Sequence, residues 1–239
     1  MAESSAQSRF HLVTCEHAGN RIPSRYAPFF RDAIAALHSH RGHDAGALRM
    51  ARELAGALHA PLVVSAISRL LIDLNRSPGR ADLYSEYSGA LDPALREEIF
   101  KRYYLPFRTK VETQVAQALQ AGQQVLHLSS HSFTPELHGE VRAADIGLLF
   151  DPERALERAL CERWRFALNT LAPDLQVRMN YPYEGSADGL TTALRARFAR
   201  GYAGIELELN QRHVHAGDTH WRRLREIVVA ALKSALQRP

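Results

Sequence analysis

The amino-acid sequence predicts an α/β fold, on the basis of two observations. Short apolar runs, partly β-branched and bounded by polar or turn residues, have the pattern of buried strands. Longer segments between these runs carry apolar residues at helical spacing, as Leu48, Ala51, Leu54, Ala55 and Leu58 do. Because strands and helices alternate along the chain, we expect helices packed against a central sheet.

Six apolar runs are expected to be strands: residues 10–15, 61–66, 70–74, 124–128, 146–150 and 205–209. Helical spacing covers 45–58 and 93–120. The second segment is expected as one helix or as two broken at Pro106, because a proline inside a helix removes a hydrogen bond.

The later helices are predicted from their first residues. Asp151 followed by Pro152 is typical of a helix start, and Asp218 opens an amphipathic segment that ends near Gln237. Residues 180–189 are rich in glycine and turn formers and precede a helical segment at 190–200. The composition of residues 180–189 predicts a loop that covers a site.

Length and composition predict a soluble protein with a single domain, residues 1–239. No apolar stretch approaches the roughly 18 to 20 residues that span a bilayer, and residues 1–9 lack the apolar core of a signal peptide. We therefore expect a cytoplasmic protein that binds no membrane. The net charge is +4, but only three of the 30 basic residues are lysines and no basic stripe is present, which argues against nucleic-acid binding.

The two cysteines, Cys15 and Cys161, are too few for a disulfide framework. Cys15 closes a predicted inner strand, where a thiol usually serves as a small apolar side chain. A cysteine hydrolase that uses Cys15 is disfavoured, because no helix start follows this residue to lower the pKa of its thiol.

Metal-binding or catalytic residue types occur where predicted strands end. An α/β sheet binds ligands beyond the carboxyl ends of its strands, so these residues are expected to meet there. The four segments are Glu16-His17, Asp73-Leu74-Asn75-Arg76, Ser130-His131-Ser132 and Glu206-Leu207-Glu208.

His17 and His131 are candidate metal ligands, because a rigid strand holds each imidazole in place. Two histidines with one carboxylate are typical of catalytic zinc, although each histidine could instead be a hydrogen-bonded structural residue. The third ligand is left open between Asp44, Glu16 and Asn20. We favour Asp44, although it could also be the N-cap of the helix that follows.

Glu206 and Glu208 lie two apart on one predicted strand, so both project from the same face of the sheet. Glu208 is nearer the end of the strand and is the candidate general base. Glu206 is expected to pair with an arginine. The alternative is that both carboxylates belong to a buried salt-bridge network.

The basic residues of the 69–76 segment indicate an acidic substrate. Arg69 and Arg76 can each grip a carboxylate with two hydrogen bonds, although they could also be surface ion-pair partners. Asn75 can donate to the same anion or to the oxyanion of an attacked carbonyl. Tyr183, in the predicted loop, can contact the substrate or pack on the helix that follows.

Seven motifs occur in the order and spacing of the N-formylglutamate amidohydrolase family, which the sequence resembles over about residues 11–215. The motifs are TCEHAGNRIP at 14–23, HDAGA at 43–47, SRLLIDLNR at 68–76, HSFTP at 131–135, DIGLLF at 145–150, NYPY at 180–183 and GIELE at 204–208. This family is related in fold to the zinc carboxypeptidases and to aspartoacylase and succinylglutamate desuccinylase.

The resemblance implies three layers with a central, mixed and mostly parallel sheet, as in phosphorylase/hydrolase-like folds. It also implies zinc, or another divalent ion, and hydrolysis of the N-formyl or another N-acyl amide of glutamate or a related acidic amino acid. Formate and glutamate would be the products, as in histidine degradation.

Matched by position, His17 and His131 correspond to the metal histidines of the family, Asn75 and Arg76 to a substrate-holding pair, and Glu208 to the catalytic glutamate. The chain departs from zinc carboxypeptidases at Asn20, where those enzymes have a ligand glutamate. Two alternatives therefore stay open. One is a binding protein for acidic ligands without catalysis, and the other is a hydrolase of a different N-acyl amino acid or short acidic peptide.

Overall fold

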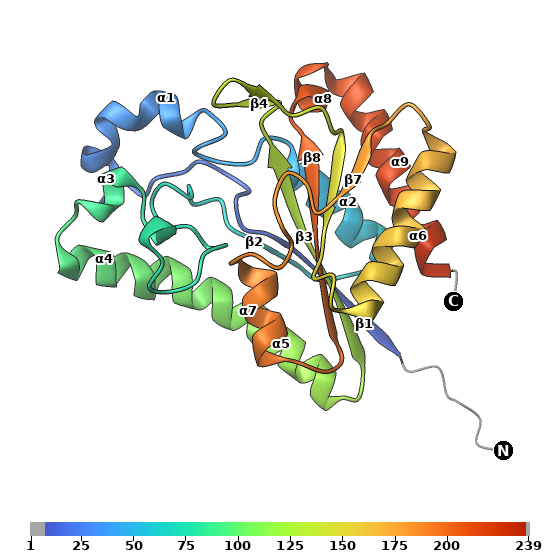
Figure 1. The fold of residues 1–239 in the computed structure, drawn as a ribbon. Helices are drawn as coiled ribbons and strands as arrows, with labels where there is room; N and C mark the ends of the chain where they lie inside the picture. Colours follow the sequence, from blue (N-terminus) through green and yellow to red (C-terminus); the bar gives the residue numbers. More distant parts are fainter. Residues whose placement is uncertain (1–7, 238–239) are drawn as a thin grey trace.

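The computed structural model describes residues 8–237 and contains a six-stranded sheet with helices on both faces (Figure 1). The strand order is β2-β1-β3-β8-β6-β7. All neighbouring pairs are parallel except β6 and β8, so the sheet is mixed and mostly parallel, as predicted. The strands are β1 (Arg9–Cys15), β2 (Leu62–Val64), β3 (Gln124–Phe133), β6 (Ile146–Leu149), β7 (Val177–Met179) and β8 (Tyr202–Asn210).

Helices cover both faces of this sheet, because its inner strands are apolar on both sides. Leu12 and Val13 of β1 point to opposite faces and belong to two different apolar clusters. The cluster that contains Val13 includes residues of α2 (Ala47–Leu58), α6 (Ala155–Leu171) and α9 (Asp218–Gln237). The cluster that contains Leu12 includes residues of α4 (Pro93–Ile99), α5 (Leu105–Gln120) and α7 (Leu190–Arg197). The fold therefore has the three layers that were predicted.

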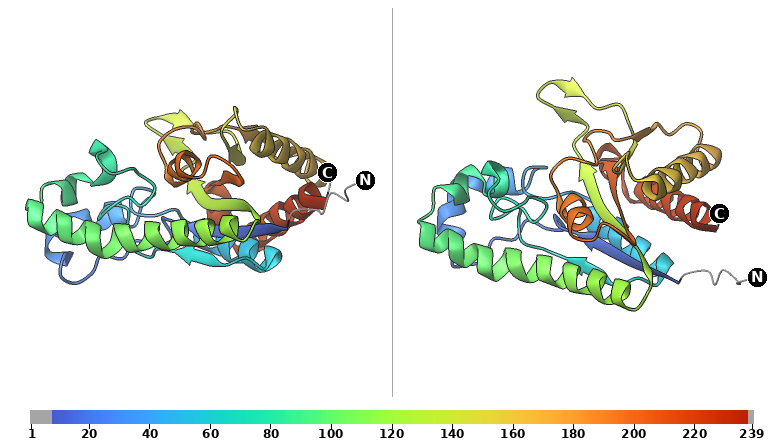
Figure 2. Two further views of the ribbon diagram at one scale, coloured as in Figure 1. Left: turned by 90° about the horizontal axis from the view of Figure 1, so that it is seen from below. Right: turned by 60° about the horizontal axis from the view of Figure 1, so that its bottom comes forward.

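The segment predicted as 93–120 follows one side of the molecule as α4 and α5, end to end (Figures 1 and 2). A π-helical turn over Phe100–Tyr104 joins them. Pro106 lies in the first turn of α5, directly after the π-helical turn.

Two predicted elements were wrong. Residues 70–74 form no strand but a buried turn, in which Leu71 N–H donates to Ser68 O (2.9 Å). Buried turns contain apolar runs as buried strands do, so an apolar run does not by itself identify a strand.

The prediction that Asp151 caps a helix was also wrong. Its Oδ1 accepts from Glu153 N–H (3.0 Å) in a turn ahead of α6, which begins at Ala155. Strand β7 was not predicted, because it is short and only partly buried.

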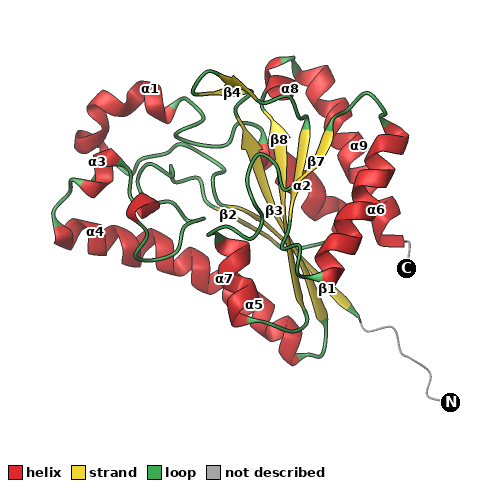
Figure 3. Ribbon diagram, viewed as in Figure 1, coloured by secondary structure: helices red, strands yellow, loops and turns green. Residues whose placement is uncertain are grey.

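The remaining elements lie around the edge of the sheet where β1, β3 and β8 end. The segment between β2 and α3 is mostly loop (Figure 3). A small hairpin of β4 (Glu136–Leu137) and β5 (Glu140–Val141) follows β3 and projects from the body of the molecule (Figures 1 and 2). The short helices are α1 (Ile34–Leu37), α3 (Glu86–Gly89) and α8 (Arg212–His215), with 3-10 turns at Ala27–Ala33 and Ala81–Leu83.

Between residues 8 and 237, no helix combines the length and the apolar character needed to cross a membrane. Residues 1–7, part of the segment considered above as a possible signal peptide, lie outside the described residues.

Candidate active site

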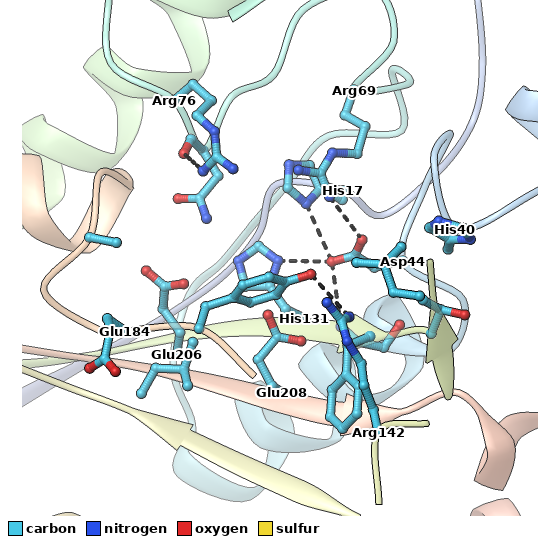
Figure 4. Close-up of a pocket in the computed structure, with 18 of the residues that line it drawn as sticks. His17, His40, Asp44, Arg69, Arg76, His131, Arg142, Glu184, Glu206 and Glu208 are labelled. Atoms are coloured by element: carbon cyan, nitrogen blue, oxygen red, sulfur yellow. Dashed lines mark hydrogen bonds and ion pairs between the residues drawn. The ribbon is translucent and has the colours of Figure 1, made fainter. Parts of the chain in front are cut away.

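A cavity of about 200 Å³ opens at the edge of the sheet where the parallel strands β1, β3 and β8 end (Figure 4). The β3–β8 register places Ser129 beside Glu206 and His131 beside Glu208, so these side chains share a face. All eight of the predicted site residues line the cavity: His17, Asp44, Arg69, Asn75, Arg76, His131, Tyr183 and Glu208.

The side chains of His17, Asp44 and His131 converge at one side of this cavity. Their potential ligand atoms all lie within 4.8 Å of one another. Nδ1 of His17 lies 3.3 Å and Nδ1 of His131 lies 2.8 Å from the same carboxylate atom, Oδ2 of Asp44. Two imidazole nitrogens and one carboxylate oxygen form a donor set that fits zinc with an open coordination position.

The outer nitrogens of both histidines are held by carboxylates. His17 Nε2 lies 2.7 Å from Asp73 Oδ1, and His131 Nε2 lies 3.1 Å from Glu16 Oε2 and 2.8 Å from the Ser129 hydroxyl. Metal-binding histidines usually have such a partner, which sets the ring orientation and the tautomer. Glu16 therefore lies behind His131 as a support.

Charge in this group is balanced between buried carboxylates and histidines. Burial favours a neutral Asp44, but His17 and His131 outweigh it and hold the pKa of Asp44 well below its usual range. Burial is similarly outweighed at Glu16, mainly by His131, and the pKa of Glu16 falls to about 2. Burial disfavours a charged His131, yet contacts with Asp44 and Glu16 raise the pKa of His131 well above its usual value. A bound cation would supply the same positive charge.

Glu208 differs from the other carboxylates of the site. Its side chain is buried, and Oε2 has no hydrogen-bond partner among the described residues. Burial is the largest cause that raises the pKa of Glu208 to about 8; His131 opposes the shift, and Asp44 and Glu206 add to it. A carboxyl group that exchanges a proton near neutral pH suits general acid–base chemistry.

Glu206 also lines the cavity, two residues before Glu208 on β8. Its Oε1 accepts from the Thr191 hydroxyl (2.6 Å) at the start of α7. The predicted pairing with an arginine was therefore wrong, because α7 brings a hydroxyl group to this position instead.

The segment of residues 69–76 supplies three polar side chains to the cavity, those of Arg69, Asn75 and Arg76. Arg69 donates from Nε and Nη2 to Asp73 Oδ2 (3.1 and 2.7 Å), and its Nη1 lies 3.6 Å from Asp44. Asn75 Oδ1 accepts from Leu190 N–H (2.6 Å), which leaves the Nδ2 donor for a ligand.

Arg76 and the predicted loop 180–189 meet across the cavity. Arg76 Nε donates to Asp82 (2.7 Å) and its Nη1 to Asp188 O (3.3 Å). Tyr183, Glu184 and Asp188 of the loop line the cavity. The loop therefore forms part of its wall.

Two weaker candidates lie outside this arrangement. Asn20 Nδ2 donates to Leu37 O (3.0 Å) and does not line the cavity. Cys15 is fully buried, and burial raises the pKa of its thiol well above the usual value, which disfavours the reactive thiolate.

Sequence reasoning missed Arg142 and His40, which also line the cavity. Arg142 follows the β4–β5 hairpin. The available signal was its position only eleven residues after His131 in the sequence, but nothing in the local pattern shows that the hairpin returns to the end of the sheet.

Comparison with known proteins agrees with this geometry. Residues 11–214 match the model of the N-formylglutamate amidohydrolase family. The chain belongs to this family. The resemblance noted in the sequence is thereby confirmed, and membership makes the protein an amidohydrolase enzyme.

Two solved structures resemble the whole chain. A gene product of Agrobacterium tumefaciens is 31% identical, with a TM-score of 0.79 over 98% of this chain and 93% of that one. An N-formylglutamate amidohydrolase of Ralstonia eutropha has a TM-score of 0.70 at 16% identity, over 97% of this chain and 94% of that one, and shows the same fold. The comparison with curated proteins gives no match.

Proposed function

We propose that this amidohydrolase is metal-dependent and cleaves the formyl amide of N-formyl-L-glutamate to give formate and glutamate. The observation that carries this proposal is the buried, unpartnered Oε2 of Glu208, in the same cavity as the His17–Asp44–His131 group. A proton acceptor and a metal-ligand set facing one small cavity are what hydrolysis of an amide by water requires.

His17, Asp44 and His131 would hold the metal ion, which we propose is zinc. When bound there, zinc would supply Lewis acidity to the carbonyl group and to water. Asp73 and Glu16 keep Nε2 of the two histidines engaged, so Nδ1 of each ring would be the atom left to bind the ion. Because Asp44 would complete this donor set, the presence of Asn20 instead of a glutamate does not favour a binding protein without catalysis.

Glu208 would move the proton in this reaction. It accepts a proton from the attacking water and then donates it to the amide nitrogen as the C–N bond breaks, which releases glutamate as the free amine and formate as the acid. Its pKa of about 8 suits both directions of transfer.

The remaining polar residues would hold the substrate. Asn75 Nδ2 and Arg76 lie next to each other in the chain and would bind the α-carboxylate that every N-acyl amino acid carries. Arg69, held by Asp73, would place its positive charge beside the reacting carbonyl oxygen, where negative charge develops.

The proposal is tested by assaying release of glutamate from N-formyl-L-glutamate, after removal of metal with a chelator and again after zinc is added. We expect activity to vanish with the chelator and to return with zinc. Activity that survives complete metal removal would contradict metal dependence. Bound zinc without hydrolysis would contradict the substrate, and N-acetyl and N-succinyl amino acids would then be assayed.

A further inference from the structure

We infer that Arg142 binds the side-chain carboxylate of the substrate and so makes the enzyme select an acidic amino acid. This inference rests on the proposed function, and it names the group that determines specificity within the same cavity.

Three arginines line the cavity, and two of them are already paired with carboxylates. Arg69 is bound to Asp73 and lies near Asp44, and Arg76 is bound to Asp82. Between residues 8 and 237, no acidic side chain lies within ion-pair distance of Arg142. Among the three, Arg142 is therefore the arginine whose charge no protein carboxylate among the described residues already offsets.

An anionic substrate needs such a charge, because the cavity wall is rich in carboxylates. The acidic residues that line it are Asp44, Glu184, Asp188, Glu206 and Glu208. A substrate with two carboxylates would be repelled by this wall unless cationic groups received both of them. A metal ion held by His17, Asp44 and His131 would offset the charge of Asp44 but not that of the other carboxylates.

The position of Arg142 is set by the backbone before any ligand binds. Its N–H donates to Pro135 O (2.8 Å), and its carbonyl oxygen accepts from Asn210 Nδ2 (2.9 Å) at the end of β8. These bonds fix the residue to the end of the sheet even though the hairpin before it projects outwards. Fixing the backbone in advance reduces the entropy lost when the side chain binds an anion.

Tyr183 orients the side chain of Arg142. The guanidinium carbon lies 5.2 Å from the centre of the Tyr183 ring, and Nη1 donates to the Tyr183 hydroxyl (3.2 Å). Because that hydroxyl accepts from Arg142, its own hydrogen is left to donate to a ligand oxygen. The pair presents two kinds of donor suited to one carboxylate.

The location of Arg142 distinguishes the side-chain carboxylate from the α-carboxylate. In Figure 4, Arg76 and Arg142 lie on opposite sides of His131 and Glu208. The α-carboxylate, close to the scissile bond, is assigned to Asn75 and Arg76, so the carboxylate that reaches the opposite wall belongs to the side chain.

The test compares N-formyl-L-glutamate with N-formyl-L-glutamine, which has the same shape but a neutral side chain. Arg142→Met should lower kcat/KM for the glutamate substrate about 100-fold, the effect of losing charge-assisted hydrogen bonds, and change that for glutamine less than about threefold. Arg178→Met is the matched control, because Arg178 also stacks on a tyrosine at 5.2 Å but does not line the cavity. It should change neither value.

Equal losses for both substrates, or no loss, would overturn the inference. If Arg142→Met does not fold, Arg142→Lys decides the question. Lysine keeps the charge without the planar fork, so the ratio of the two kcat/KM values should fall about tenfold. An unchanged ratio would contradict the inference.

Failure of the proposed function would have a different result, because wild-type, zinc-loaded protein would then hydrolyse neither substrate. In that case the inference is judged on binding alone. Glutarate should protect the wild-type protein against thermal unfolding more than glutaramate does, and Arg142→Met should abolish the difference. Equal protection by the two compounds would overturn it.

Discussion

His131 on β3 and Glu208 on β8 are neighbours in the parallel register, yet no hydrogen bond joins their side chains. Both nitrogens of His131 are taken by Asp44 and Glu16, so it cannot satisfy Glu208. The neighbouring strand on the other side places Gly147, which has no side chain, beside Glu208. The arrangement of these three strands thus leaves Oε2 of Glu208, the proposed proton acceptor, without a hydrogen-bond partner among the described residues.

Glu208→Gln should reduce turnover of N-formyl-L-glutamate by at least about 100-fold, because an amide cannot accept the proton from water. Zinc content should stay at the wild-type value, since Glu208 is not in the ligand group. The matched control is Glu206→Gln, which changes the same residue type on the same face and should cost less activity. Equal losses of turnover in the two variants would contradict a specific role of Glu208 as the proton acceptor.

Asp44→Ala should abolish stoichiometric zinc binding, because it removes the carboxylate that both histidines face. Metal content after gel filtration, measured by mass spectrometry of the metal, gives the result. Asp32→Ala, at an exposed position, is the control and should retain zinc. Full zinc occupancy in Asp44→Ala would show that the ligand set is different.

Asp73→Asn should weaken zinc binding about 10- to 100-fold while the fold is retained, because Asp73 orients His17 through Nε2. Competition with a chromogenic chelator measures the affinity. Glu16→Gln should have a similar effect through His131. Wild-type affinity in both variants would show that the outer nitrogens of the histidines need no carboxylate.

The buried His127 should make the folded protein less stable at acidic pH. It is buried between the hydroxyls of Thr14 and Tyr202, and burial is the main cause that lowers its pKa to about 4 from an ordinary value of 6.5. Between these two values the unfolded chain binds more protons than the folded one. The contribution of His127 to the free energy of unfolding is therefore fully present above pH 6.5 and is lost as the pH falls through 4. Between these values, the free energy of unfolding falls by at most about 1.4 kcal/mol per pH unit.

Replacing His127 by Gln should flatten this part of the stability profile. The measurement is the free energy of unfolding in urea at several pH values between 4 and 7, for wild type, His127→Gln and the exposed control His215→Gln. The difference between wild type and His127→Gln should shrink or change sign towards pH 4. A difference in the free energy of unfolding that stays constant between pH 4 and 7 would contradict the lowered pKa of His127.

Gly147 and Gly56 form a matched pair for alanine substitution. A Cβ at Gly147 would lie 1.8 Å from Tyr181 O and 3.2 Å from Glu208 Cβ, so Gly147→Ala should displace the 180–189 loop and reduce both stability and activity. A Cβ at Gly56, inside α2, would meet nothing within 4 Å. Gly56→Ala should raise the free energy of unfolding by about 0.5–1 kcal/mol. Thermal unfolding of both variants gives the comparison.

The fold class and the converging residues were predictable for the same reason. Apolar runs mark the strands, and in a parallel sheet polar residues after such runs meet at one edge. This logic predicts that His17 and His131 are close together. Asp44 was harder to assign, because a residue before a helix is also a suitable cap, and only the packing of α2 against β1 and β3 places it between the histidines.

The parts that were not predicted depend on long-range packing. Residues 70–74 resemble a strand in composition, and only tertiary contacts make them a turn. Arg142 was missed because a charged residue beside a short hairpin is usually solvated. Its position in the cavity wall depends on Asn210 and Tyr183, which are 68 and 41 residues away in the sequence.

The strand order also bears on how the enzyme is made in the cell. Strand β3 pairs on one side with β1, and on the other with β8, which begins 69 residues after β3 ends. Until the ribosome has released residues 202–210, β3 has an open edge of the kind that can recruit strands from other chains. The three proposed metal ligands, His17, Asp44 and His131, are all translated before Glu208, so the edge of β3 that carries His131 stays open until the proposed proton acceptor is made.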